Sequence, residues 1–434
     1  MSVIVKLTAK EQQMLDGKEG RLKQCAIENI IKYAEILGAR ELCTVTKATL
    51  FCGKHGYLSS CKADSFDEMF SKAQLAKDDE IIVFDSIEDC CQAQSDVGPC
   101  EASEYEAFSQ SKELFDENSH YLKRAHEAGV TIAGTCAPYL NGWLPIPGEH
   151  FVTTESGVTI IGNSLWGACC NSDGIEAAFW SAICGRTPKW GKHTKEGRYG
   201  NIAVDVQYTP KDKLDWDLLG KAMGDKLPPH SIPVLTGDFS NASFNNIRQF
   251  LTAVAISSNC ELCHIPGITY DFRTPQEALG GRKTETLVVT ADDVENTYSK
   301  VCDEGESEVD LVVLGCPHYD ILQIKQAADC IRGKRVADGV SFQIWTSHPI
   351  KQMAQLNGYL AVIEEAGGRI YTGSCPTTIG SCLFEKHRGF AFDSLKQSVS
   401  SRLFIDRANY VGSMENCIET AVLGQWKECF AWKK

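Results

Sequence analysis

Short apolar runs of strand length recur along this chain and alternate with longer stretches of helical spacing. Residues 309–314, Val-Asp-Leu-Val-Val-Leu, are rich in β-branched side chains and predict a buried parallel strand. Such alternation is typical of βαβ units, so we expect an α/β fold with a parallel sheet. Further strands are expected at residues 43–46, 81–84, 130–133, 158–161, 201–206, 232–236, 342–345 and 369–371. Helices are expected at residues 22–36, 104–128, 321–331 and 349–365.

Helix-start and helix-stop signals support parts of this pattern. Thr8 and Glu11 have the spacing of a capping box, which predicts a first short helix directly after Thr8. Gly367 and Gly368 follow the stretch at 349–365 and predict that its helix ends there.

Three of the expected strands run into a loop that holds a cysteine next to or near a proline. The loops are Gly134-Thr135-Cys136-Ala137-Pro138-Tyr139, Gly315-Cys316-Pro317-His318 and Gly373-Ser374-Cys375-Pro376. Open α/β sheets bind ligands at the carboxyl ends of their strands, and cysteine is a soft ligand for iron or zinc. We therefore expect Cys136, Cys316 and Cys375 to converge on one metal site. The alternative is three buried thiols, because buried cysteine is common.

The length of 434 residues is large for one domain. We expect an N-terminal α/β region at residues 1–205, with the first cysteine loop. A C-terminal α/β region is expected at residues 206–434, with the second and third loops.

Charge and cysteine content narrow the function classes. The formal net charge of −14 argues against a nucleic-acid partner and against an anionic membrane surface. The N-terminus lacks the pattern of a signal peptide, and no apolar run has the length that spans a bilayer. We therefore expect a cytoplasmic protein whose twenty cysteines stay reduced.

A second cysteine motif, Cys260-x-x-Cys263-His264, matches the haem c attachment pattern. Haem c attachment takes place outside the cytosol, so we do not assign it. A zinc or thiol-redox enzyme that uses Cys260 and Cys263 remains an alternative. Cys100 and its neighbouring cysteines match no compact zinc signature, and His55 is expected in a surface loop.

Polar groups that suit a carboxylate lie near the expected strand at 158–161. Asn163 and Ser164 are flanked by glycines and offer amide, hydroxyl and backbone N–H groups to an anion. Arg186 and Arg198 are cations able to bind a carboxylate with two hydrogen bonds.

Taken in order, several of these motifs resemble the aconitase X family, a branch of the aconitase superfamily. They are Thr135-Cys136-x-Pro138-Tyr139-Leu140, Glu155-Ser156, Asn163-Ser164-x-x-Gly167-Ala168, Gly185-Arg186-Thr187-Pro188-x-x-Gly191-x-His193 and Gly315-Cys316-Pro317-His318. The resemblance implies an aconitase-like multidomain architecture, with mostly parallel sheets flanked by helices. It also implies iron, either mononuclear or as an iron–sulfur cluster, and a small swivelling domain that is fused or a separate subunit. We find no room for that domain here, so we expect a separate small subunit.

The resemblance further implies a hydro-lyase that removes water from a small hydroxy acid, with cis-3-hydroxy-L-proline as the first candidate substrate. An iron with an open position would bind the leaving hydroxyl as a Lewis acid. By analogy with the superfamily, a serine of the small subunit is a candidate proton acceptor. The expected metal ligands are Cys136, Cys316 and Cys375. The expected catalytic residues are Ser156, His318 and Lys396, and the expected substrate-binding residues are Glu155, Asn163, Ser164, Arg186 and His193.

The chain departs from the family pattern around the expected substrate pocket. Residues 169–173 replace an Arg-Thr-Asn-Arg-Glu run of the family, and Gly373 replaces an Asp. These changes leave two further alternatives: a large subunit of the phosphomevalonate dehydratase type, or a non-catalytic relative that binds metal.

Overall fold

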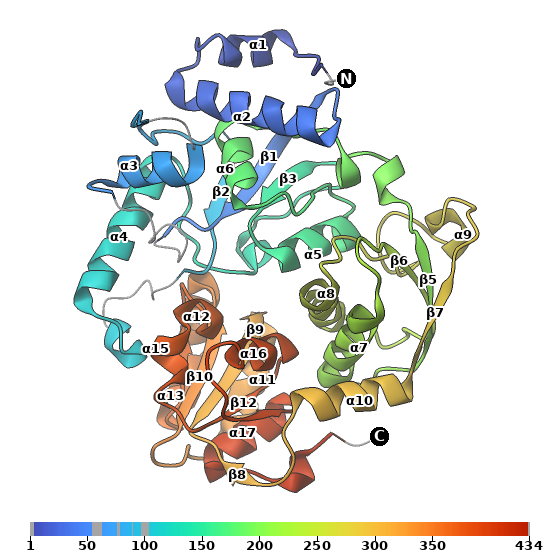
Figure 1. Cartoon of the computed structure of the whole chain (residues 1–434). Coiled ribbons are helices and arrows are strands. Elements are labelled where there is room, and N and C mark those ends of the chain that lie inside the picture. The colour runs from blue at the N-terminus through green and yellow to red at the C-terminus, as the bar shows by residue number, and fades with distance from the viewer. Residues whose placement is uncertain (1–3, 54–62, 76–78, 89, 97–103, 433–434) are drawn as a thin grey trace.

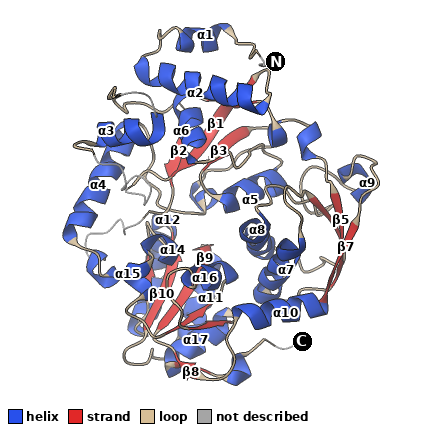
Figure 2. Cartoon of the chain, in the orientation of Figure 1, coloured by secondary structure: helices blue, strands red, loops and turns tan. Residues whose placement is uncertain are grey.

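The structure is a computed structural model that describes residues 4–53, 63–75, 79–88, 90–96 and 104–432; His55 and Cys100 lie outside these residues. Three sheets of three or more strands follow one another along the chain, and helices flank each of them (Figures 1 and 2). Neighbouring strands in these sheets run parallel, except that β4 is antiparallel to β1. The expected α/β fold with mostly parallel sheets is confirmed.

The first unit, at the top of Figure 1, contains a sheet of order β2-β1-β3, with β4 paired to β1. Its core lies between this sheet and the helices α2 and α6. Its strands are β1 Leu42–Leu50, β2 Cys90–Ala93, β3 His150–Thr153 and β4 Arg186–Pro188. Its α-helices are α1 Ala9–Leu15, α2 Arg21–Leu37, α3 Phe66–Phe70, α4 Lys112–Glu127, α5 Ser156–Trp166 and α6 Ile175–Cys184. Its shorter helical turns are η2 Ser71–Leu75, η3 Tyr105–Phe108, η4 Pro138–Asn141, η5 Gly191–His193 and η6 Glu196–Arg198.

The second unit lies at the right of Figure 1 and contains a parallel sheet of order β6-β5-β7. Helices α7 and α8 pack against each other, and α5 of the first unit packs on α8. Its strands are β5 Ile202–Gln207, β6 Pro233–Thr236 and β7 Thr286–Thr290. Its helices are α7 Lys213–Lys226, α8 Phe244–Ser258, α9 Pro275–Ala278 and α10 Ala291–Val301.

The third unit, at the bottom of Figure 1, contains a five-stranded parallel sheet of order β11-β10-β9-β12-β13. One hydrophobic core runs through the second and third units together. The strands of the third unit are β8 Ser307–Glu308, β9 Leu311–Tyr319, β10 Ser341–Thr346, β11 Arg369–Tyr371, β12 Gly389–Phe392, β13 Ala408–Val411 and β14 Gln425–Trp426. Its helices are α11 Ile321–Ile331, α12 His348–Leu356, α13 Tyr359–Glu365, α14 Pro376–Ile379, α15 Ser381–Phe384, α16 Leu395–Ser401 and α17 Met414–Leu423, followed by the turn η7 Glu428–Phe430.

The expected division at residues 205 and 206 falls inside β5, and residues 206–434 contribute to two separate sheets. In the part of the chain that the structure describes, no helix is both long and apolar enough to cross a membrane.

Some expected elements differ from the observed ones for identifiable reasons. Residues 158–161 lie in helix α5, not in a strand; the helix is buried on nearly all sides, so its apolar run shows no helical period. Residues 81–84 form no strand, because side chains accept the hydrogen bonds of their backbone N–H groups. Ser71 Oγ accepts a hydrogen bond from Ile82 N at 2.8 Å. The expected helix at 349–365 is two helices, separated where Gly358 adopts a φ of 75°.

The segment Gly315-Cys316-Pro317-His318 is not a loop after a strand but an irregular part of β9. Leu314 pairs with Ile344 and Tyr319 pairs with Thr346, so these four residues lie opposite Trp345 alone. Asp393 holds both ends of this bulge: Oδ1 accepts from Gly315 N at 3.3 Å, and Oδ2 accepts from the Tyr319 hydroxyl. The bulge interrupts the pairing with β10 without ending the strand.

Gly315 is required at the start of the bulge. Its φ is 100°, and an added Cβ would lie 2.3 Å from the Trp345 carbonyl oxygen. We expect Gly315→Ala to lower the free energy of unfolding by about 2–5 kcal/mol, from the strain of a positive φ and from overpacking. Gly339→Ala is the matched control, because its φ is 86° and nothing lies within 4 Å of the added Cβ. Denaturant unfolding of both variants would contradict this account if they lost equal stability.

Candidate active site

A cavity of about 490 Å³ lies between the first and third units. Phe51, Ser95 and Glu155 line it from the first unit, each just after the end of one of the parallel strands β1, β2 and β3. Cys375 and Lys396 line it from the third unit, after β11 and β12. The carboxyl edges of two parallel sheets therefore meet at this cavity, which is where α/β sheets bind ligands. The other lining residues are Cys136, Gly315, Cys316, His318, Thr377, Thr378, Gln397 and Phe404.

The three cysteines of the expected metal site all line this cavity. Cys136 follows a segment that runs beside β2, Cys316 lies in the bulge of β9, and Cys375 precedes α14. Burial raises the pKa of the Cys136 thiol to about 12, with a further rise from the charge of Glu155, while Lys396 opposes both. Burial also raises the pKa of the Cys316 thiol, and Lys396 again opposes it.

The distances between these three thiols restrict the kind of metal centre that they can bind. Among the described residues, the one group of three metal-binding side chains whose ligand atoms all lie within 4.8 Å of one another is Cys43, His150 and His193. The three cavity thiols are therefore more widely spaced. Two sulfurs that bind one ion at about 2.3 Å are at most about 4.6 Å apart.

Lys396 and Glu155 form an ion pair across the cavity. Nζ of Lys396 lies 2.7 Å from Oε1 of Glu155, and their side chains are 21% and 13% exposed. Burial opposes the charge of Lys396, but Glu155 and the thiols of Cys316 and Cys136 raise its pKa overall, so the ammonium is retained. A partly buried cation beside thiols and a carboxylate is suited to bind an acid substrate.

His318 connects the three cysteine segments. Its Nε2 lies 3.0 Å from the Ser374 carbonyl oxygen and so donates, which leaves Nδ1 to accept from the Thr135 hydroxyl at 2.9 Å. Burial lowers the pKa of His318 to about 4. The ring is therefore neutral near pH 7 and both nitrogens are engaged, so His318 has no free nitrogen for acid–base chemistry.

Asn163 and Ser164 lie away from the cavity lining, inside α5. Asn163 Nδ2 donates to the carbonyl oxygens of Cys170 and Glu261, and its Oδ1 accepts from Cys170 N. Ser164 Oγ accepts from Cys263 N at 3.0 Å. These groups tie α5 to two neighbouring loops, and both amide donors of Asn163 are used by backbone carbonyls.

Arg186, His193 and Ser156 also lie outside the cavity lining. Arg186 is buried beside β1 and pairs with Glu11 at 2.8 Å. His193 lies against His150. Ser156 is exposed at the start of α5.

The Cys260 and Cys263 thiols do not have the environment of a redox pair. Both are buried, and burial raises the pKa of Cys260 to about 12 and raises that of Cys263 well above its ordinary value. Reactive thiols are exposed and have lowered pKa values. Both thiols therefore belong to the core.

Sequence reasoning missed several lining residues. Phe51 directly follows β1 and Ser95 comes two residues after β2, so a search of strand ends would have found them. Thr377 and Thr378 follow the third cysteine loop. Phe404 lies between α16 and the start of β13, and nothing in the sequence marks it.

Comparison with known proteins agrees with this architecture. Three family models match in succession: the aconitase X first domain at residues 4–196, the second domain at 200–299 and the third domain at 309–423. The chain belongs to the aconitase X family. A crystal structure of aconitase X from Thermococcus kodakaraensis in its holo form superimposes with a TM-score of 0.81 at 25% identity and covers 96% of this chain and 100% of that chain.

Curated relatives in the family are dehydratases, which are hydro-lyases. The phosphomevalonate dehydratase large subunit of Thermococcus kodakarensis is 25% identical over 92% of this chain and 95% of its own length. The cis-3-hydroxy-L-proline dehydratase of Hypocrea jecorina is 25% identical over 98% of this chain and 70% of its own length.

The charge of Lys396 should be measurable at the thiols of the metal-free chain. Lys396→Met removes the cation that lowers the pKa of Cys136, so less thiolate forms at a given pH. We expect iodoacetamide to alkylate Cys136 roughly tenfold more slowly at about pH 9, as one pKa unit gives. Mass spectrometry of the Cys136 peptide measures this rate.

Lys47→Met is the matched control, because Lys47 pairs with Glu149 at 2.6 Å with the same side-chain exposures, 21% and 13%. Equal rates in the Lys396 variant and in the wild type would show that the ammonium does not act on the thiol.

Proposed function

We propose that this chain is the large subunit of an iron-dependent hydro-lyase and that the 490 Å³ cavity is its dehydration site. The observation that carries the proposal is that three thiols and the Lys396–Glu155 pair line one cavity, at the facing carboxyl edges of two parallel sheets. The dehydratase activity of the relatives supports the reaction class.

The donor set of the cavity fits iron. Cys136, Cys316 and Cys375 supply three thiolates from three separate segments, and thiolates hold iron–sulfur clusters. Their wide spacing favours a cluster over one ion bound by all three. When bound, an iron with an open position polarises the hydroxyl that leaves.

The remaining side chains would bind and orient the substrate. Lys396 would meet the negative charge that develops on the substrate carboxylate as the α-proton leaves. Glu155 is the one carboxylate among the described lining residues, which makes it this chain's candidate for proton acceptor. His318 acts as a positioning residue, because its two hydrogen bonds hold the cysteine segments in place.

Charge in the cavity favours a substrate with a single carboxylate. Of the lining residues that the structure describes, Lys396 alone is a lysine or arginine, and it already faces Glu155. Phosphate recognition typically uses several cations. This favours cis-3-hydroxy-L-proline or a similar acid. Phosphomevalonate is the second candidate, because the large subunit that accepts it in Thermococcus kodakarensis matches this chain over 95% of its length.

A small subunit would complete the site. The relative from Thermococcus kodakarensis is a large subunit, which implies an enzyme of two chains. At the cavity, Phe404 is partly exposed and the adjacent Leu403 is 79% exposed, an apolar edge that suits a partner surface. A partner that closes the cavity would exclude water from the reaction.

Iron loading tests the cysteine assignment. After anaerobic reconstitution, the Cys316→Ala variant should hold less than about one tenth of the iron that the wild type holds. Loss of a group that only supports a ligand already lowers metal affinity by about 10–100-fold, and Cys316 is itself an expected ligand. Cys330→Ala is the control, since Cys330 lies on α11 outside the cavity lining. Acid-labile sulfide that accompanies the iron would identify a cluster. Equal iron in both variants would remove the thiols from the site.

Turnover tests the reaction and the partner together. We expect the chain alone to show little dehydration, and the complex with a small chain co-purified from the native host to dehydrate one of the two candidate acids. In that complex Lys396→Met should abolish most turnover, whereas Lys47→Met should keep it. Iron without turnover on either acid would indicate a non-catalytic relative, and high turnover by the single chain would show that no partner is needed.

A further inference from the structure

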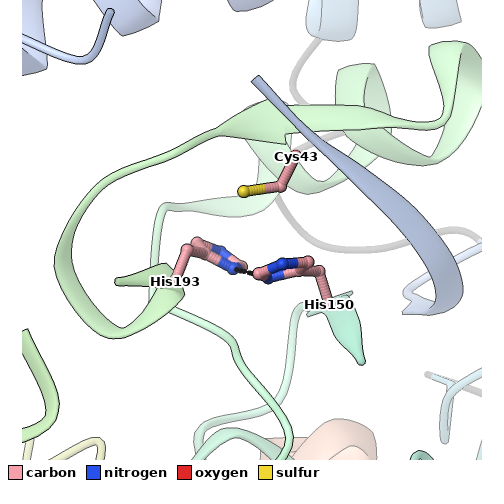
Figure 3. Close-up of side chains that lie close together, drawn as sticks. All are labelled: Cys43, His150 and His193. Atoms are coloured by element: carbon pink, nitrogen blue, oxygen red, sulfur yellow. Dashed lines mark hydrogen bonds between the residues drawn. The ribbon is translucent and has the colours of Figure 1, made fainter. Parts of the chain in front are cut away.

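A second group of metal-binding side chains lies in the first unit, away from the cavity. Cys43 is on β1, His150 begins β3, and His193 ends the turn η5; Figure 3 shows the three side chains facing one another. One ligand atom from each lies within 4.8 Å of the others. The cavity lies at the opposite end of β1, about 26 Å away along the strand at 3.3 Å per residue.

The sheet places these residues together through its register. His150 pairs with Val45 on β1, and Cys43, two residues before Val45, points to the same face of the sheet. The antiparallel pairing of Cys43 with Thr187 on β4 brings the following segment back over this face, with His193 on it.

The two histidines already share the geometry of ligands to one ion. Their Nδ1 atoms are 3.0 Å apart, whereas two nitrogens bound to one tetrahedral ion are about 3.3 Å apart. His193 is 4% exposed, and its Nε2 has no hydrogen-bond partner in the described structure. Burial lowers the pKa of His193 to about 3 and also lowers that of His150, so both rings are neutral, as metal binding requires.

We propose that Cys43, His150 and His193 form a binding site for a divalent ion of the zinc type, separate from the iron centre. One thiolate and two imidazoles are the mixed sulfur and nitrogen set that zinc takes, with the fourth position left to water. On binding, the Cys43 thiol gives up its proton to solvent and the sulfur bonds to the ion.

The surroundings of the site permit this charge. Lys189 and Arg198 are the nearby cations that act on His150, but each is paired with a carboxylate: Lys189 with Glu41 at 3.0 Å, and Arg198 with Asp271 at 2.8 Å. A thiolate would reduce the charge that the ion adds. The bound ion would join β1, β3 and η5 and hold these three segments together.

Zinc content and thermal unfolding of the full chain test the site. After chelation and reloading with zinc alone, the wild type should hold one equivalent more than Cys43→Ser or His150→Gln. Zinc should raise the Tm of the wild type by several degrees and that of the two variants by less, because an ion stabilises only the state that binds it. The cavity thiols contribute equally in all these proteins.

Cys184→Ala is the matched control, because its thiol is also buried and burial likewise raises its pKa to about 12, as for Cys43. It should bind zinc as the wild type does. If Cys43→Ser fails to fold, His150→Gln decides the question, since His150 is only partly buried. Equal zinc content and an equal Tm response in the wild type and both site variants would overturn the proposal and leave a hydrogen-bonded histidine pair beside a buried thiol.

Discussion

The buried ring of His318 is the contact on which the cavity depends, because all three units meet at this residue. Its ring bonds Thr135 of the first unit and Ser374 of the third, and its backbone carbonyl accepts from Arg248 of the second at 3.1 Å. A buried polar group left without its partner costs about 1–3 kcal/mol, so each of these bonds penalises displacement of a unit. The three thiols stand one or two residues from Thr135, His318 and Ser374, and their spacing is fixed by the same contact.

The cavity is lined by polar and sulfur-containing side chains because the carboxyl edges of two sheets face each other there. Strand ends supply short loops, and loops carry the polar and sulfur groups that the sheet interior excludes. The bulge in β9 adds to this arrangement. It keeps Leu314 and Tyr319 in register with β10 while Cys316 faces the neighbouring unit. Asp393, which accepts at both ends of the bulge, makes this irregular backbone a defined structure.

Local signals in the sequence predicted much of the fold and part of the site. The capping box of Thr8 and Glu11 and the run at 309–314 depend on neighbouring residues alone, and both elements are present. Cys136, Cys316 and Cys375 all line one cavity, but of these only Cys375 comes after the end of a strand, because Cys316 lies within β9. The expected strand at 158–161 is part of α5, because a helix buried on nearly all sides has the composition of a strand.

Other parts of the site depend on tertiary contacts that no local pattern reveals. Asn163 has the residue type of a substrate ligand, but loops distant in sequence use its amide. Whether a polar side chain faces a ligand or another loop depends on packing alone. Cys43, His150 and His193 come from separate segments and form no motif, so only the strand register shows that they meet.

The positions of the lining residues along the chain determine when during synthesis the cavity becomes complete. The cavity takes residues from Phe51 to Phe404, so it is incomplete until nearly the whole chain has been made. Contacts between such distant residues form late in folding, after the local ones. The group of Cys43, His150 and His193 is complete once the first unit has emerged. A cofactor that binds all three cavity cysteines could therefore be inserted only after Cys375 has emerged and the third unit has folded.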